Sequence, residues 1–170
     1  MNCTFIVNFV GTATATTIKE LAAITNENQG KWLISKVNFI ENQVAAIIKI
    51  EVPTGNAEVV KAAFHSHPDL LVHITDCDNQ TGLQEIIYQI RVDANDRFGI
   101  VNEITHLLDG QGISILDMDC QRVFLATGGG VSSSLFSSTM TLKLPSEIRI
   151  EDVIKELEAL SEDTRVMLDS

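Results

Sequence analysis

The chain has 170 residues, 45% of them apolar, with 10 glycines and 3 prolines, which excludes intrinsic disorder and collagen-like or low-complexity classes. Its 23 acidic and 12 basic residues give a net charge of −11 with histidine neutral, a balance that repels phosphate backbones and anionic lipids. We therefore expect no direct binding to nucleic acid or membranes. No apolar run is long enough to span a bilayer, and the start at Met1-Asn2-Cys3-Thr4 lacks the basic region of a secretory signal, which predicts a cytoplasmic protein.

The three cysteines, Cys3, Cys77 and Cys120, are widely spaced and form no CxxC pair. An odd number at such spacing fits neither a disulfide framework nor a zinc knuckle. We expect three reduced thiols, and neither a metal nor another cofactor.

The first half of the chain predicts six elements in the order strand, helix, strand, strand, helix, strand. Phe5, Val7 and Phe9 fall on one side of an alternating strand over residues 5–10, and a helical period follows around residues 18–22. That helix is expected to end at Glu27-Asn28-Gln29-Gly30, with the glycine in the left-handed position that closes many helices. The remaining elements are expected at residues 31–41, 44–52, 56–65 and 70–74.

The second half repeats this order at an offset of about 83 residues. A strand over residues 88–93 is followed by a strong helical period at Ile100, Ile104 and Leu108, and Gly112 is expected to close that helix. The remaining elements are expected at residues 113–125, 135–144, 150–160 and 165–168. The connection over residues 126–134 contains three consecutive glycines and is expected to be a flexible surface loop.

A βαββαβ unit of this size predicts a four-stranded antiparallel sheet with two helices on one face, which is the ferredoxin-like arrangement. The sequence therefore predicts an α+β protein with two such domains. We place them at residues 1–76 and 83–170, joined by a polar linker over residues 77–82. Because ferredoxin-like sheets serve many functions, the function must be argued from a site.

The segment Asp96-Arg97-Phe98-Gly99-Ile100-Val101 is the most informative loop, because it joins a predicted strand to the strongest predicted helix. We expect Asp96 to be the N-cap of that helix, and Gly99 to allow a close approach to the backbone because it has no Cβ. The free N–H groups of the first helical turn favour an anion such as a carboxylate. With the Asp96 carboxylate beside them to accept an ammonium, the site matches the two ends of a free amino acid.

At these residues the sequence resembles the ACT domain, whose loop reads Asp-x-Pro-Gly-Ile and whose second strand begins near Gly-Ile-Asn-Ile. The counterpart of that second motif here is Gly112-Ile113-Ser114-Ile115, and the match spans most of the second half. Phe98 replaces the usual proline, so the fixed φ of proline is lost and an aromatic wall is added. Two such repeats over the whole chain resemble the glycine cleavage system transcriptional repressor family.

This resemblance implies a non-enzymatic, amino-acid-responsive repressor of glycine cleavage genes that binds glycine or a similar small amino acid. It also implies action through a protein partner, a DNA-binding activator, which agrees with the acidic net charge. Ligands of the family lie between this loop and the second strand of a neighbouring module. The implied ligand-binding residues are Asp96, Arg97, Phe98, Gly99, Ile100, Ser114 and Ile115. The first domain carries Gly11-Thr12-Ala13-Thr14-Ala15-Thr16-Thr17 at the same place, without the acid and the glycine, which predicts a degenerate site.

Several other functions compete with this hypothesis. An amino-acid-sensing regulatory subunit of a metabolic enzyme stays open, because ACT repeats support both roles, and exposed sheet edges favour a homodimer in either case. An acylphosphatase-like enzyme is disfavoured because it would need an arginine and an asparagine on a phosphate loop, and residues 12–17 contain neither. An RNA-binding module is disfavoured because it would need exposed aromatics and basic flanks, whereas aromatics are only 5% of this acidic chain. A metal cluster of His65, His67 and His73 is disfavoured because an alternating strand and a helix end place these groups on different faces. No catalytic residue is predicted.

Overall fold

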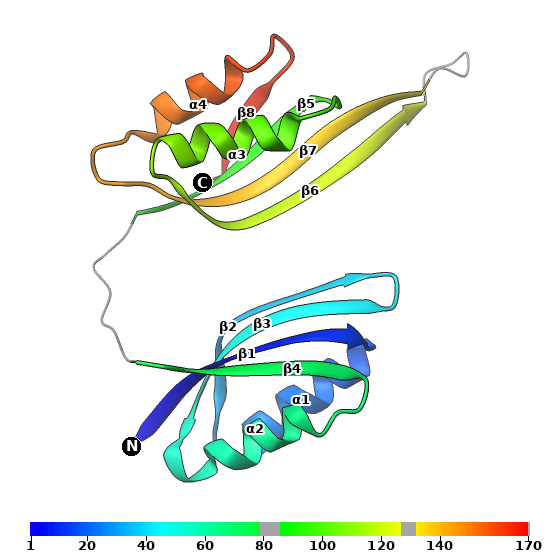
Figure 1. The fold of residues 1–170 in the computed structure, drawn as a ribbon, viewed down its shortest axis with the longest axis vertical. Coiled ribbons are helices and arrows are strands. Elements are labelled where there is room, and N and C mark those ends of the chain that lie inside the picture. Colours follow the sequence, from blue (N-terminus) through cyan, green and yellow to red (C-terminus); the bar gives the residue numbers. More distant parts are fainter. Residues whose placement is uncertain (79–85, 127–131, 170) are drawn as a thin grey trace. The chain divides into compact units, whose positions relative to one another are not determined.

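The computed structural model describes residues 1–78, 86–126 and 132–169. The chain divides into two compact units, Met1–Thr81 and Gly82–Ser170, called unit 1 and unit 2 below. Each unit has the same order of elements, and each contains one four-stranded sheet (Figure 1).

Unit 1 is a βαββαβ unit whose strands pair in the order β2-β3-β1-β4, all antiparallel. Its elements are β1 (Asn2–Thr12), α1 (Ala15–Glu27), β2 (Lys31–Ile40), β3 (Gln43–Pro53), a single 3₁₀ turn (Thr54–Asn56), α2 (Ala57–His65) and β4 (Leu70–Cys77). Both helices lie on one face of this sheet (Figure 1).

Unit 2 repeats the topology with the strand order β6-β7-β5-β8, again antiparallel throughout. Its elements are β5 (Ile87–Asn95), α3 (Ile100–Gly110), β6 (Ser114–Ala126), β7 (Ser132–Lys143), α4 (Ile150–Glu158) and β8 (Arg165–Asp169). Its two helices also share one face of their sheet (Figure 1). The predicted fold class, α+β with two ferredoxin-like units, is confirmed.

The core of each unit lies between its sheet and its two helices, because every second residue of the central strands points to the same side. Phe5 and Val7 on β1 are fully buried, and they pair in register with Ile50 and Ile48 on β3, which are buried as well. In unit 2 the same role falls to Ile90 on β5, opposite Met140 on β7. The alternation in the sequence thus identified the inward face of both central strands.

The helix ends differ from the expectation at one of two places. Gly112 takes a positive φ of 70° after α3, as predicted. After α1, however, Gln29 takes the left-handed conformation with a φ of 60°, so the assignment of this role to Gly30 was wrong. The Gly30 N–H instead donates to the Thr25 carbonyl at 2.9 Å, which ends the helix one residue earlier than the glycine suggested.

Strands extend into both predicted connections. The strand β4 continues to Cys77, one residue into the segment assigned to the linker, and the end of that segment lies outside the described residues. Likewise β6 reaches Ala126 and β7 begins at Ser132, so strand residues occupy both ends of the predicted loop over residues 126–134, of which residues 127–131 lie outside the described residues. The β6–β7 hairpin is therefore longer than the sequence indicated.

Candidate functional site

The turn between β5 and α3 is held open by a single glycine. Gly99 is the N-cap of α3 and has a φ of +80°, in the left-handed region that favours glycine. A Cβ on Gly99 would meet no atom within 4 Å, so the glycine serves the backbone conformation and not a close contact. The prediction that Asp96 is the N-cap was wrong, because Gly99 takes that position three residues later and no side chain caps the helix.

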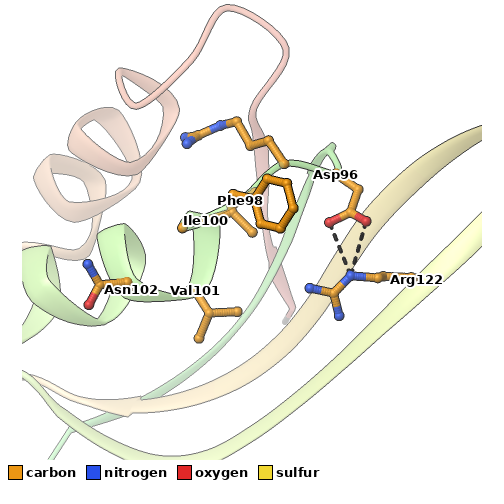
Figure 2. A pocket seen from close by; sticks show the side chains of 8 residues that line it. Asp96, Phe98, Ile100, Val101, Asn102 and Arg122 are labelled. Carbon is orange, nitrogen blue, oxygen red and sulfur yellow. Dashed lines mark hydrogen bonds and ion pairs between the residues drawn. The ribbon is translucent and has the colours of Figure 1, made fainter.

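Asp96 instead fastens the loop to the β6–β7 hairpin (Figure 2). Both of its carboxylate oxygens accept hydrogen bonds from Arg122 Nε, at 3.0 and 3.1 Å, and one also accepts from Ser134 Oγ at 3.1 Å. The Asp96 backbone N–H donates to the Ser134 carbonyl at 3.0 Å. With its side chain only 22% exposed, Asp96 is the fixed partner of a guanidinium and not an open acceptor for an ammonium group.

Two further contacts hold the ends of this turn. Arg97 forms an ion pair with Glu103 on α3, and the hydrogen bond between them raises the pKa of Arg97 and lowers the pKa of Glu103. The Asn95 backbone N–H donates to the carboxylate of Asp163, and this bond, followed by one from Ser161, lowers the pKa of Asp163. The turn is thus tied to α3, to the segment before β8 and to the hairpin.

These contacts surround a pocket of about 470 Å³ at the N-terminus of α3. It is lined by Asp96, Arg97, Phe98, Gly99, Ile100, Val101, Asn102 and Arg122. The first hydrogen bond of the helix runs from the Glu103 N–H to the Gly99 carbonyl at 2.9 Å, so the N–H groups of residues 100–102 are those that a helix leaves without an internal acceptor. Phe98 is fully exposed at the rim (Figure 2).

The structure brings five of the seven predicted site residues, 96–100, together around this pocket. Ser114 and Ile115 lie elsewhere in unit 2, since Ser114 and Ile87 both pair with Lys143 at the sheet end where β5 begins, whereas the pocket follows the end of β5. Their contact with a ligand of a neighbouring module stays a prediction.

Three lining residues, Val101, Asn102 and Arg122, were not among the predicted site residues, and Arg122 is the charged one. It pairs in register with Phe136 and shares the phase of Met118 and Cys120, so it belongs to the helix-facing side of β6. A charged residue in the phase of an apolar strand face was the available signal. Its contact with Asp96 spans 26 residues of sequence and depends on the register of the long hairpin, which sequence spacing does not reveal.

The equivalent turn in unit 1 is built from threonines. Thr14 is the N-cap of α1, and its backbone N–H donates to Thr17 Oγ1 at 3.5 Å. Neither a charged residue nor a glycine follows Thr12 before the helix begins, in agreement with the sequence. Any ligand binding in unit 1 would therefore lack the chemistry found at α3.

Two other classes of site are absent from residues 1–78, 86–126 and 132–169. No three histidine, cysteine or acidic side chains of this part of the chain lie close enough to hold a metal ion. Nor does it contain a helix that is both long and apolar enough to cross a membrane.

The repeated topology defines a protein of two tandem ferredoxin-like units. No family model and no curated protein matches the sequence. Among solved structures, an unknown protein from Galdieria sulphuraria has a TM-score of 0.80 at 14% identity, covering 99% of this chain and 98% of that chain. A protein described as a candidate glycine cleavage system transcriptional repressor has a TM-score of 0.63 at 13% identity, covering 99% and 97% of the two chains. At these identities the similarity extends to the fold alone.

Proposed function

We propose that this protein is a non-enzymatic regulator whose affinity for a partner protein changes when a small carboxylate metabolite occupies the pocket at α3. The observation that carries the proposal is that pocket, where helix N–H groups, a guanidinium and apolar walls converge on a space of about 470 Å³. The ACT resemblance makes free amino acids the first class to test, with glycine as the reference ligand.

The regulation requires only a modest energy difference between two states. A ligand that binds one arrangement of the protein more tightly shifts the population toward it, and the partner responds to that shift. A tenfold change in partner affinity corresponds to about 1.4 kcal/mol of coupling. One ion pair and a few hydrogen bonds around the pocket are sufficient to supply this amount.

The partner is proposed to be a DNA-binding transcription activator, so that the protein acts as a repressor of glycine cleavage genes without touching DNA. A net charge of −11 supports this, because it disfavours direct contact with phosphate backbones and favours a basic protein. A regulatory subunit of a metabolic enzyme is the alternative, since the same scaffold can bind an enzyme surface.

The working unit is proposed to be a homodimer. The sheets end at β2 and β4 in unit 1 and at β6 and β8 in unit 2, and such edges present unpaired backbone groups to a second copy. In a dimer, Ser114 and Ile115 at the start of β6 are available to the ligand of a neighbouring module.

Calorimetric titration of the full chain with the common amino acids and small carboxylic acids tests the ligand part of the proposal. We expect heat of binding for at least one ligand and its loss in Asn102→Trp, which fills the pocket from an exposed position of α3. The matched control is Lys19→Trp, 83 positions earlier and exposed on α1, which should leave binding unchanged. No heat with any ligand would overturn the proposal.

Affinity capture from the native cell extract, with and without glycine, tests the partner. Ligand-dependent recovery of a DNA-binding activator supports the repressor, and recovery of a biosynthetic enzyme supports the alternative. Purified partner and protein should then form a complex whose affinity changes with ligand, and no change would exclude ligand-linked control.

A further inference from the structure

Arg122 has an unusual position for a charged side chain. It lies on the helix-facing side of β6, in phase with the partly buried Met118 and Cys120. Its side chain is nevertheless 50% exposed. The guanidinium therefore has one side toward the protein and the other toward the pocket at the N-terminus of α3.

Asp96 contacts only the Nε side of this guanidinium. Arg122 Nε makes both hydrogen bonds to the carboxylate, whereas Figure 2 shows the two terminal nitrogens turned away from Asp96. A guanidinium carries five N–H donors, and Nε supplies only one of them. The terminal N–H groups match the geometry of a planar carboxylate, which they bind in pairs.

The charges around the pocket favour an anion without an ammonium group. Asp96 is the one acidic residue among the lining residues, and Arg122 and Ser134 already engage its oxygens. An ammonium entering the pocket would meet Arg122 at short range with no uncompensated carboxylate to hold it. A carboxylate would meet Arg122 and the first turn of α3, both of which favour negative charge.

The remaining walls fit a small apolar body. Phe98 is fully exposed at the rim, and Val101 on α3 also lines the pocket (Figure 2). An apolar substituent packed against these two side chains is removed from water, which contributes about 25 cal/mol per Å² of buried area. The pocket thus matches a carboxylate joined to a short aliphatic chain.

We propose that Arg122 is the specificity-determining residue of the α3 pocket, and that it selects small aliphatic carboxylates lacking an amino group, such as 2-oxo acids, over the corresponding amino acids. This inference rests on the proposed function only in that it uses the same pocket. It narrows the ligand class from carboxylate metabolites in general to those without an ammonium group.

Matched ligand pairs test the inference by calorimetry on the full chain. The pairs are 2-oxoisovalerate with valine and glyoxylate with glycine, which differ in the amino group at the same carbon. We expect the oxo acid to bind at least tenfold more tightly in each pair, with the larger absolute affinity for 2-oxoisovalerate because of its apolar chain. In Arg122→Gln the preference should fall to about onefold or reverse, since Asp96 is then free to accept an ammonium.

Three variants separate a role in specificity from a structural role. Arg122→Lys keeps the positive charge and should keep the preference for the oxo acid. Asp96→Asn removes the carboxylate of the pocket and should keep or increase that preference. Arg91→Gln removes a half-exposed arginine that is paired with Asp93 on the opposite face of the sheet, and it should change neither affinity. Thermal unfolding of each variant checks that unit 2 remains folded.

The outcomes distinguish this inference from the proposed function. Equal or tighter binding of valine than of 2-oxoisovalerate by the unmodified protein would overturn the inference while the regulator stands. A preference that persists in a folded Arg122→Gln variant would overturn the role of Arg122. Binding of neither ligand class would overturn the inference together with the proposed function.

Discussion

The two units share one topology and one strand register but enter their first helix differently. Buried positions of these helices correspond at an offset of 83 residues: Thr17, Leu21 and Thr25 in unit 1, and Ile100, Ile104 and Leu108 in unit 2. At two of these three positions unit 1 therefore has threonine where unit 2 has a large aliphatic side chain. The fold tolerates this exchange because the buried threonine hydroxyls find partners within unit 1, as Thr25 Oγ1 does with the Leu21 carbonyl at 2.9 Å.

On the sheet face that points away from the helices, unit 1 has the apolar residues and unit 2 has the charged ones. Val10 and Leu71 pair in register in unit 1 and are 50% and 76% exposed. The equivalent pair in unit 2 is Asp93 with Arg165, and Asp93 also accepts a hydrogen bond from Arg91 at 2.9 Å. The inward positions of the central strands are thus apolar in both units, while the outward positions and the helix entrance differ.

The largest effect is expected from the glycine at the end of β1. A Cβ on Gly11 would lie 2.0 Å from the backbone oxygen of Asp69, and its φ of +153° is already unfavourable. Gly11→Ala should therefore destabilise unit 1 by about 3 kcal/mol or more. Gly99→Ala, with open space around the new Cβ, should cost unit 2 about 1 kcal/mol for its positive φ alone.

Urea unfolding can follow the two units separately, because the single tryptophan, Trp32, lies in unit 1 and the single tyrosine, Tyr88, lies in unit 2. The expected result is a large loss in the Trp32 midpoint of Gly11→Ala and a small loss in the Tyr88 midpoint of Gly99→Ala. Similar losses in both variants would show that the backbone at Asp69 yields easily, and that the contrast between the glycines is wrong.

Most of the fold could be predicted because it depends on local periodicity. The alternation of Phe5, Val7 and Phe9 and the helical spacing of Ile100, Ile104 and Leu108 each identify an inward face, and the repeated order of elements determines the sheet topology. The exception at Gln29 arose because the left-handed position usually favours glycine, and Gly30 stood next to it. Gly30 has a different role, because a Cβ there would lie 2.9 Å from the Thr25 side chain and 3.2 Å from the backbone oxygen of Glu51.

The candidate site was predictable only in part, because its chemistry depends on a long-range pair. The loop around Gly99 could be located from the sequence, since a strand, a glycine and a strong helix follow one another. The occupation of Asp96 by Arg122 and Ser134 could not, because it depends on the length and register of the β6–β7 hairpin. A residue expected to hold the ligand thus proved to hold the protein together.

A smaller effect is expected from the threonine that distinguishes α1 from α3. Thr25 is 1% exposed, donates to the Leu21 carbonyl and accepts a hydrogen bond from Trp32 Nε1 at 3.1 Å. Thr25→Val keeps the shape but removes both hydrogen bonds, so we expect unit 1 to lose about 1 kcal/mol. Thr25→Ser keeps the hydroxyl and removes only the methyl group, so it measures the contribution of the methyl contact without the hydrogen bonds. A Thr25→Val variant as stable as the parent would show that these bonds do not matter to α1.

The smallest effect is a difference in pH dependence between the units, and it follows from the sign of two pKa shifts. The hydrogen bond from the Asn95 N–H lowers the pKa of Asp163, so its contribution to unit 2 is present above the unfolded value of about 3.9 and is lost as the pH falls through the lower folded value. The hydrogen bond to Asp76 raises the pKa of Lys61 in unit 1, so that contribution is lost only as the pH rises above the ordinary lysine range.

Between pH 6 and 3, the Tyr88 midpoint of Asp163→Asn should therefore fall less steeply than that of the parent, because the amide oxygen still accepts the N–H but does not titrate. Asp109→Asn, which removes an exposed charge at the far end of α3, is the control and should follow the parent. If the midpoint of Asp163→Asn falls as steeply as that of the parent, then titration of Asp163 does not cause the loss of unit 2 stability at low pH.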